Sequence, residues 1–289
     1  MLAYRDIYSK WLNEVKEPDL MKELNDIHNQ EEEIKERFYM NLDFGTGGIR
    51  GILGAGVNRM NVYTVRKATQ GVADFLNKEY AGQTIQMVIA HDSRHKSKEF
   101  ALESALVLAK NGIVAKLFPD LAPTPLLSFA ITHLKAQSGI VITASHNPKQ
   151  YNGYKLYGSH GGQMTDAKSH EVIQYVNAIE EELNVETMSR EEAESKGLLI
   201  WLDDAVLTAY LAKVKGLILN QELVAKHARD LKIIYTPLHG TGRVPVTRLF
   251  QEAGFSQVKV VPAQEFPDPD FSTVTLPNPE DPAVYQLDK

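Results

Sequence analysis

The stretch Gly139–Gly158, GIVITASHNPKQYNGYKLYG, joins an apolar run to a cluster of polar side chains. Ser145 and Asn147 follow the apolar run closely, and Lys155 comes later in the same stretch. A serine hydroxyl can carry an acyl or a phosphoryl group when a base or a cation lies beside it. The same residues also suit a turn whose serine and asparagine side chains cap backbone groups. Local chemistry alone leaves both interpretations of Ser145 open.

Of the two reactions, acyl transfer fits these residues poorly. The nucleophile elbow of α/β-hydrolases is Gly-x-Ser-x-Gly, but Thr143 and Asn147 stand where its glycines would be. Phosphoryl transfer fits better, because His146, Asn147 and Lys155 supply donors that can spread the charge of the transferring group, usually with a divalent metal. Partial desolvation beside other cations would lower the pKa of Lys155 toward the range of an acid–base catalyst. The alternative interpretation is that Lys155 is an exposed lysine on a strand.

The glycine-rich segment 44–51, FGTGGIRG, is a second candidate for phosphate binding. Its glycines allow backbone N–H groups to approach an anion, and Arg50 can clamp a phosphate with two parallel hydrogen bonds. The segment fits neither the Walker pattern, since no Gly-Lys-Ser/Thr follows, nor a clean dinucleotide fingerprint. A hairpin is its alternative interpretation.

Polar bursts also follow two other predicted strands, at 91–94 and 236–242. His91 and His95 are spaced for a metal pair, but the glutamate of an HExxH site is missing. We therefore expect Asp92 to support a loop. The HGTG run at 239–242 suits either a phosphate loop or a plain turn from strand to helix.

The elements that must position these residues alternate between helix and strand. About 40 residues of helical pattern come first, and a β-α-β-α-β order follows, which predicts an α/β layer fold with strands buried on both faces. The expected helices are 62–80, 98–112 and 124–135, and the expected strands are 85–94, 113–118 and 139–147. Residues 165–195 suggest a long helix and then a solvated acidic segment. A second strand-helix-strand unit follows from residue 231, before a proline-rich, mostly looped tail.

Composition limits the class of protein. The 289 residues are 43% hydrophobic and 24% charged, with a net charge of −6. The absence of cysteine excludes disulfides, thiolate metal sites and cysteine nucleophiles. A nucleic-acid binder is more often basic, and no apolar stretch approaches the ~20 residues of a membrane span. The N-terminus lacks the apolar core of a signal peptide. We expect a cytoplasmic protein with neither nucleic acid nor membrane as a partner.

Together the motifs resemble a known family. TASHNPKQYNGYKLYG closely resembles the active-serine loop of the α-D-phosphohexomutase superfamily, and FGTGGIRG resembles its N-terminal arginine loop. DSRHKS and YTPLHGTG are similar to the bacterial phosphoglucomutase branch. The resemblance runs from about Tyr4 to the LPNPED tail. It implies a three-layer α/β/α first domain with a mixed sheet, over 1–200, and an incomplete second α/β domain, over 201–289.

The resemblance also implies an isomerase of the intramolecular phosphotransferase type. Ser145 would be a phosphoserine that exchanges its phosphoryl group with glucose 1- and 6-phosphates through glucose 1,6-bisphosphate. Mg²⁺ would bind the Ser145 phosphoryl oxygen, and Arg50 would hold the transferring group. Lys155 would do acid–base work, His146 would line the site and orient phosphate or hydroxyl groups, and Asn147 would shape the loop.

One departure from the family is large. Its metal loop, Asp-x-Asp-x-Asp-Arg, is not found; Asp268 and Asp270 have part of the spacing, but Ser272 follows and no apolar strand precedes them. We interpret that turn as a loop that resembles the metal motif in spacing but does not bind a metal. The third and fourth family domains, with the sugar-specificity loop, are also absent, so the chain is expected to be an N-terminal portion, without mutase turnover and with apolar sheet surface exposed.

Several alternatives stay open. The motifs do not separate a phosphoglucomutase from a phosphomannomutase or a phosphopentomutase, because the family's sugar choice depends on its third domain. A non-catalytic phosphate-binding fragment is a further alternative. For the full-length enzyme we expect a monomer or a weak dimer.

Overall fold

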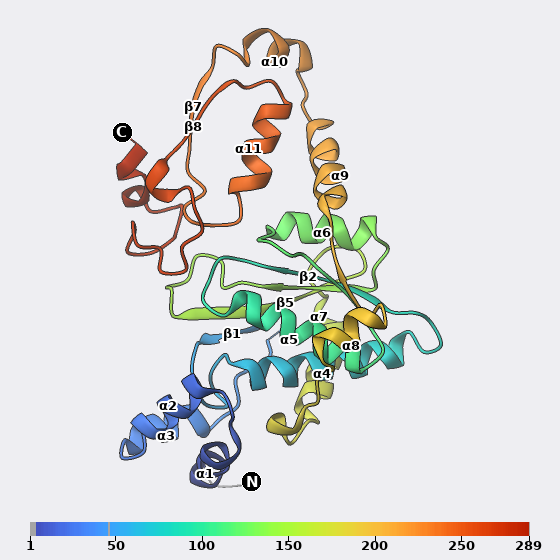
Figure 1. Cartoon of the computed structure of the whole chain (residues 1–289), viewed down its shortest axis with the longest axis vertical. Helices are drawn as coiled ribbons and strands as arrows, with labels where there is room; N and C mark the ends of the chain where they lie inside the picture. Colours follow the sequence, from blue (N-terminus) through green and yellow to red (C-terminus); the bar gives the residue numbers. More distant parts are fainter. Residues whose placement is uncertain (1–3, 46, 289) are drawn as a thin grey trace.

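The computed structural model describes residues 4–45 and 47–288 (Figure 1). Its centre is a six-stranded mixed sheet in the order β1-β5-β4-β2-β3-β6. The strands are β1 (Gly48–Ile52), β2 (Gln86–His91), β3 (Val114–Leu117), β4 (Ser138–Ile142), β5 (Tyr151–Gly158) and β6 (Leu199–Trp201). Strands β4, β2, β3 and β6 run parallel, whereas β5 is antiparallel to both β4 and β1. The expected mixed sheet is confirmed.

Helices cover both faces of this sheet, because its central strands are apolar on both sides. Along β2, Met87 and Ile89 belong to one hydrophobic cluster, and the alternate residues Val88 and Ala90 belong to another. The first cluster is completed by α4 (Val62–Glu79), α5 (Ser97–Lys110) and α7 (Asp166–Asn177), and the second by α6 (Thr124–His133) and α9 (Asp204–Lys215). Figure 1 shows these helices as layers on opposite sides of the sheet. The predicted three-layer α/β/α architecture is confirmed.

The N-terminal helices pack beside this domain. They are α1 (Tyr4–Glu14), α2 (Pro18–Asp26) and α3 (Glu31–Phe38). The Trp11 ring is fully buried and meets Phe38 and Tyr63 edge-on, at 5.7 and 5.5 Å between ring centroids. Such edge-to-face contacts add to the stabilisation that burial gives. The helical pattern predicted from the sequence is confirmed, although a turn at 27–30 divides its second part.

The acidic segment after α7 is mostly exposed, as expected, but it includes short regular elements. It contains a 3₁₀ turn, η1 (Glu182–Asn184), a helix, α8 (Arg190–Ser195), and the edge strand β6 beside β3. The Glu182 side chain is buried and accepts a hydrogen bond from Trp11 Nε1 at 2.8 Å. The sequence alone does not reveal this buried carboxylate, because the tryptophan that offsets the cost of burying it lies far away in the sequence.

The second unit is a strand-helix-strand arrangement, as expected. Its elements are α10 (Gln221–His227), β7 (Lys232–Tyr235), α11 (Arg243–Glu252), β8 (Gln257–Val260), η2 (Pro262–Gln264) and η3 (Pro282–Asp288). Strands β7 and β8 are parallel and joined by α11. Helix α10 was not expected from the sequence. Helix α9 leads from the large sheet to this unit (Figure 1). Within residues 4–45 and 47–288, no helix is long and apolar enough to cross a membrane.

Candidate active site

Ser145 lies in the loop that joins β4 to β5, just beyond the carboxyl end of β4. Its φ of 56° places it in the left-handed region, which L-residues rarely adopt. Its backbone N–H donates to Thr143 Oγ1 at 3.0 Å, and its Oγ lies 3.3 Å from His146 Nδ1. The capped turn and the nucleophile are therefore compatible: Thr143 caps the turn, and Ser145 lines a cavity.

The arginine segment lies directly beside this loop. Strand β1 pairs with β5 so that Arg50 is opposite Gly153, and the Arg50 guanidinium donates from Nη1 to Asn147 Oδ1 at 2.9 Å. Gly153 allows the close approach, because a Cβ there would lie 2.6 Å from the Thr143 carbonyl oxygen and 2.9 Å from that of Ile49. The glycine-rich motif and the serine-bearing motif are thus neighbours in space. Thr46 of the segment lies outside the described residues.

Lys155 lies on β5, in register with Gly48 of β1 and Val141 of β4. Partial burial lowers the pKa of its amino group, and the Arg50 guanidinium lowers it further, while the Asp92 carboxylate acts in the opposite direction. Desolvation and a like charge both disfavour a protonated amine. The direction expected from the sequence for Lys155 is therefore found in the structure.

A cavity of about 390 Å³ brings the three polar bursts together. Ser145 and His146 line it from the first sheet, next to Asp92 and Ser93 at the end of β2. The second unit contributes residues 236–238 and 240–242, and the tail contributes Phe271, Pro277, Pro279 and Tyr285. The described residues that line it do not include Arg50, Asn147 or Lys155. Arg50 lies on β1, Lys155 lies on β5, and Asn147 lies in the loop before β5.

Arg94 is the functional residue that sequence reasoning missed. Its side chain is fully buried, and its guanidinium donates four hydrogen bonds to carbonyl oxygens of the serine loop. The acceptors are the carbonyls of Ser145 (2.9 Å), Asn147 (2.6 Å), Pro148 (2.9 Å) and Tyr151 (3.1 Å). Hydrogen bonds from a charged donor are stronger than neutral ones, so this side chain fixes the path of the loop. The sequence feature that could have indicated Arg94 is its place in an Asp-Ser-Arg run at the end of a strand.

Asp92 supports Arg94, as the sequence led us to expect for a loop residue. Its Oδ1 accepts hydrogen bonds from the Arg94 backbone N–H at 3.0 Å and from Ser97 Oγ at 2.6 Å. Its Oδ2 lies 3.4 Å from Arg94 Nε. Asn152 continues the network by donating from Nδ2 to Ser97 Oγ and to the His95 carbonyl, both at 2.9 Å. The loops after β2 and β4 therefore form one hydrogen-bonded unit.

The histidines singled out from the sequence serve different contacts. His91 is buried, burial lowers its pKa, and its Nδ1 lies 3.1 Å from the Asp92 carbonyl oxygen. His95 Nε2 lies 3.3 Å from Asp270 Oδ1. His239, in the HGTG run, is buried and joins the tail through the Phe266 carbonyl and Thr273. HGTG is here the turn before α11 that also anchors the tail.

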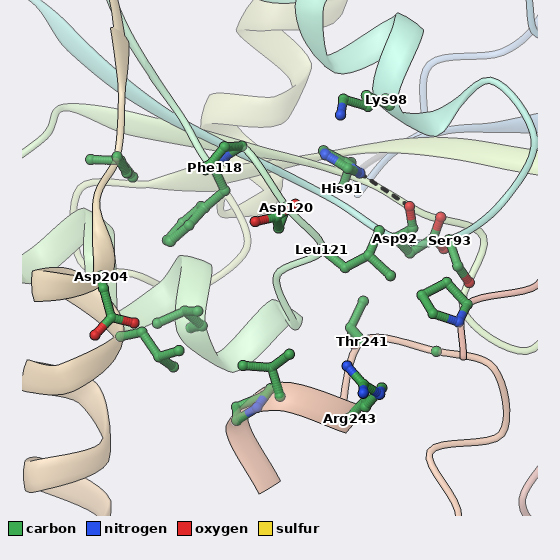
Figure 2. Close-up of a pocket in the computed structure, with 18 of the residues that line it drawn as sticks. His91, Asp92, Ser93, Lys98, Phe118, Asp120, Leu121, Asp204, Thr241 and Arg243 are labelled. Atoms are coloured by element: carbon green, nitrogen blue, oxygen red, sulfur yellow. Dashed lines mark hydrogen bonds between the residues drawn. The ribbon is translucent and has the colours of Figure 1, made fainter. Parts of the chain in front are cut away.

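A second cavity, of about 700 Å³, is also lined by the Asp92–Ser93 segment. Figure 2 shows His91 and Lys98, from the first domain, facing Thr241 and Arg243 of the second unit across it. The two cavities share four lining residues, which are Asp92, Ser93, Gly240 and Thr241. Both cavities are therefore lined by residues of the two units and by the loop that supports Arg94.

The described residues do not fit a closed magnesium site. No group of three or more His, Asp or Glu side chains in 4–45 and 47–288 is placed to hold a metal. Asp268 is engaged by the backbone N–H groups of Asp270 and Ser272, and Asp270 is engaged by Lys149 and His95. Magnesium prefers several oxygen ligands at once. The carboxylates of that turn are thus occupied by hydrogen bonds and ion pairs.

Comparison with known proteins agrees with this geometry. Residues 41–183 match the family model "Phosphoglucomutase/phosphomannomutase, alpha/beta/alpha domain I", and residues 208–289 match domain II of the same family. A phosphoglucomutase of Staphylococcus saprophyticus is 38% identical over 279 residues, which are 96% of this chain and 49% of that protein. One of Staphylococcus aureus (strain USA300) is 38% identical over 257 residues, or 88% of this chain and 45% of that protein.

Solved structures agree as well. A putative phosphomannomutase of Thermus thermophilus superposes with a TM-score of 0.70 at 25% identity, covering 86% of this chain and 51% of that one. A family member from Burkholderia thailandensis gives a TM-score of 0.60 at 21% identity, over 86% of this chain and 49% of that one, which shows the shared fold. The chain spans about half the length of the relatives it matches. By sequence and by fold, the chain belongs to the phosphoglucomutase/phosphomannomutase family.

Proposed function

We propose that this chain carries the phosphoryl-bearing serine of a phosphoglucomutase that interconverts glucose 1-phosphate and glucose 6-phosphate. The observation that carries the proposal is the convergence of the polar bursts around Ser145, in a loop that Arg94 holds at four carbonyl oxygens. A preorganised loop with cationic groups beside it suits phosphoryl transfer, in which positioning and charge stabilisation do most of the work.

In the proposed reaction, the phosphoryl group of Ser145 moves to a hydroxyl of the sugar monophosphate. The bond from phosphorus to Ser145 Oγ breaks as the bond to the sugar oxygen forms, giving a hexose 1,6-bisphosphate. Lys155 takes the proton of the attacking hydroxyl, a role that its lowered pKa supports. The bisphosphate then reorients and returns its other phosphoryl group to Ser145.

Neighbouring residues hold the transferring group. Arg50 supplies a guanidinium next to the serine loop, and its bond to Asn147 Oδ1 fixes its position before the phosphate arrives. His146, whose Nδ1 is 3.3 Å from Ser145 Oγ, orients phosphate or hydroxyl groups. Asn147 shapes the loop through its carbonyl bond to Arg94. Mg²⁺, the family's metal, would bind the Ser145 phosphoryl oxygen, with its other ligands outside the described residues.

The remaining parts of the proposal concern the whole protein. We propose domain boundaries at 1–200 and 201–289, a division that falls within β6, the last strand of the large sheet. We keep the expectation that the two further family domains are needed for turnover, and that a cytoplasmic monomer or weak dimer acts on sugar phosphates. Glucose is preferred over mannose or a pentose because the curated relatives reported above are named phosphoglucomutases.

Mass spectrometry of the intact chain tests the role of Ser145. After incubation with glucose 1,6-bisphosphate and Mg²⁺, the chain should gain one phosphoryl group on Ser145, and the Ser145→Ala variant should gain none. In a coupled assay the same chain should give no net conversion of glucose 1-phosphate. Phosphate on another residue, or an Ala variant that still gains it, would contradict the assignment.

A further inference from the structure

The turn at residues 268–271, where the sequence places two aspartates, lies against the serine loop. The Phe271 ring covers the Arg94 guanidinium, with its centroid 5.1 Å from Cζ, and only 5% of Phe271 is exposed. On the same turn, Asp270 Oδ1 accepts a hydrogen bond from Lys149 Nζ at 3.0 Å. Lys149 directly follows Pro148, one of the carbonyl acceptors of Arg94. The turn thus contacts the serine loop directly at Lys149 and indirectly through Arg94.

The turn itself is tightly built. Asp268 accepts hydrogen bonds from the backbone N–H groups of Asp270 at 2.9 Å and Ser272 at 2.8 Å, and the Ser272 N–H holds the pKa of Asp268 below its ordinary value. Phe271 has a φ of 50°, a conformation that costs free energy for a bulky side chain. The Asp268 bonds hold the backbone in this conformation, which directs the ring at Arg94.

The position of Phe271 matters because of how Arg94 is used. Four of its N–H groups donate to the serine loop, and its Nε lies 3.4 Å from Asp92 Oδ2 without a hydrogen bond, so the faces of the guanidinium are left for other contacts. An aromatic ring attracts a cation across its face, and it also keeps water away from the guanidinium. Excluding water strengthens the hydrogen bonds that the same group makes.

We propose that the 268–271 turn of the second unit is a positioning element for the serine loop. It acts through Phe271 on Arg94, and through Asp270 on Lys149. Phe271 is the principal part, because the Asp270–Lys149 pair is about half exposed at both side chains, and such pairs contribute little to stability. The functional meaning of this inference rests on the proposed role of Ser145, whereas the ordering of the loop does not.

Hydrogen exchange of the 289-residue chain tests the proposal. Phe271→Leu keeps apolar bulk but removes the ring face, so amides in 143–152 should exchange roughly three to ten times faster. Phe271→Trp restores a ring face and should return exchange close to that of the unmodified chain. The matched control is Phe266→Leu, which removes a ring lying 4.5 Å from the Arg243 guanidinium in the same tail and should leave 143–152 unchanged.

Two results would overturn the proposal. One is unchanged exchange of 143–152 in Phe271→Leu. The other is acceleration spread evenly over the first sheet, which would indicate general destabilisation. Phosphorylation of Ser145 by glucose 1,6-bisphosphate separates this inference from the proposed function. Faster loop exchange in a chain that is never phosphorylated supports the positioning role and contradicts phosphoryl transfer to Ser145 in this chain. Normal phosphorylation with unchanged loop exchange supports the proposed function and contradicts the positioning role.

Discussion

Lys155 is the residue at which stability and chemistry conflict. A half-buried ammonium next to Arg50 is costly, and the lowered pKa of Lys155 records that cost. A hydrophobic side chain of similar length would avoid it. The cost is useful in the proposed reaction, since a lysine with a lowered pKa exchanges protons nearer to neutral pH.

Replacing Lys155 with methionine should therefore have opposite effects on stability and activity. The pKa of Lys155 is lower in the folded chain than in the unfolded chain, where it is about 10.4. Between these two pKa values the unfolded chain binds more protons than the folded chain. The contribution of Lys155 to stability therefore rises with pH through that window. Lys155→Met should raise the free energy of unfolding at pH 7 and remove that rise. Phosphorylation of Ser145 should fall by roughly 10²–10⁴-fold. Urea unfolding at several pH values would contradict this if the variant kept the original dependence.

The site residues predicted from the sequence share one property: each belongs to a motif made of residues that are adjacent in the chain. Ser145, His146 and Lys155 lie in one continuous motif. Arg94 could not be assigned in that way, because its partners are backbone carbonyls more than 50 residues away, and any residue type offers a carbonyl. When a side chain binds only backbone carbonyls, the residue types of the bound segment give no sign of the contact.

At the scale of elements, the close packing of β1, β5 and the end of β4 brings the two motifs together. Apolar periodicity predicted the long helices and buried strands well, because burial dictates those patterns. It missed β6, whose three residues are too few to show a period, and the short α10. It also could not pair β1 with β5, since strand pairing depends on contacts between distant parts of the chain.

Gly153→Ala should disturb this packing in a way that Gly71→Ala does not. Both glycines are crowded: a Cβ at Gly153 would lie 2.6 Å from the Thr143 carbonyl oxygen, and one at Gly71 would lie 2.5 Å from Val176 Cγ2, between α4 and α7. Overpacking typically costs about 1–3 kcal/mol, so both variants should lose stability in urea unfolding. Only Gly153→Ala should also slow Ser145 phosphorylation, because it pushes β1, which carries Arg50, away from the start of the serine loop. Equal slowing in both variants would argue against a specific role for this packing.

At the scale of the whole molecule, the second unit is much less covered than the first. Its large apolar side chains include Leu219, which is 101% exposed, Leu217 at 67% and Ile234 at 59%. Clustered exposed apolar groups favour association with another surface. The first domain, in contrast, buries two hydrophobic clusters on either side of its sheet.

The chain should therefore self-associate as its concentration rises. Sedimentation velocity should show an increasing average mass for the unmodified chain, and less of it for a Leu217→Glu, Leu219→Glu double variant. A matched Lys213→Glu, Lys215→Glu variant, which alters charge nearby without removing apolar surface, serves as the control. A concentration-independent monomer would contradict the prediction.

The left-handed backbone of Ser145 has a consequence for choosing mimics of its proposed phosphorylated state. Threonine, the nearest chemical relative with a hydroxyl, is β-branched and pays most in this conformation, so a poorly active Ser145→Thr enzyme would reveal backbone cost as much as lost chemistry. Aspartate tolerates the left-handed region and brings a negative charge. Ser145→Asp is thus the substitution that can imitate a permanently phosphorylated enzyme with the least distortion, although its single charge is smaller than that of a phosphate.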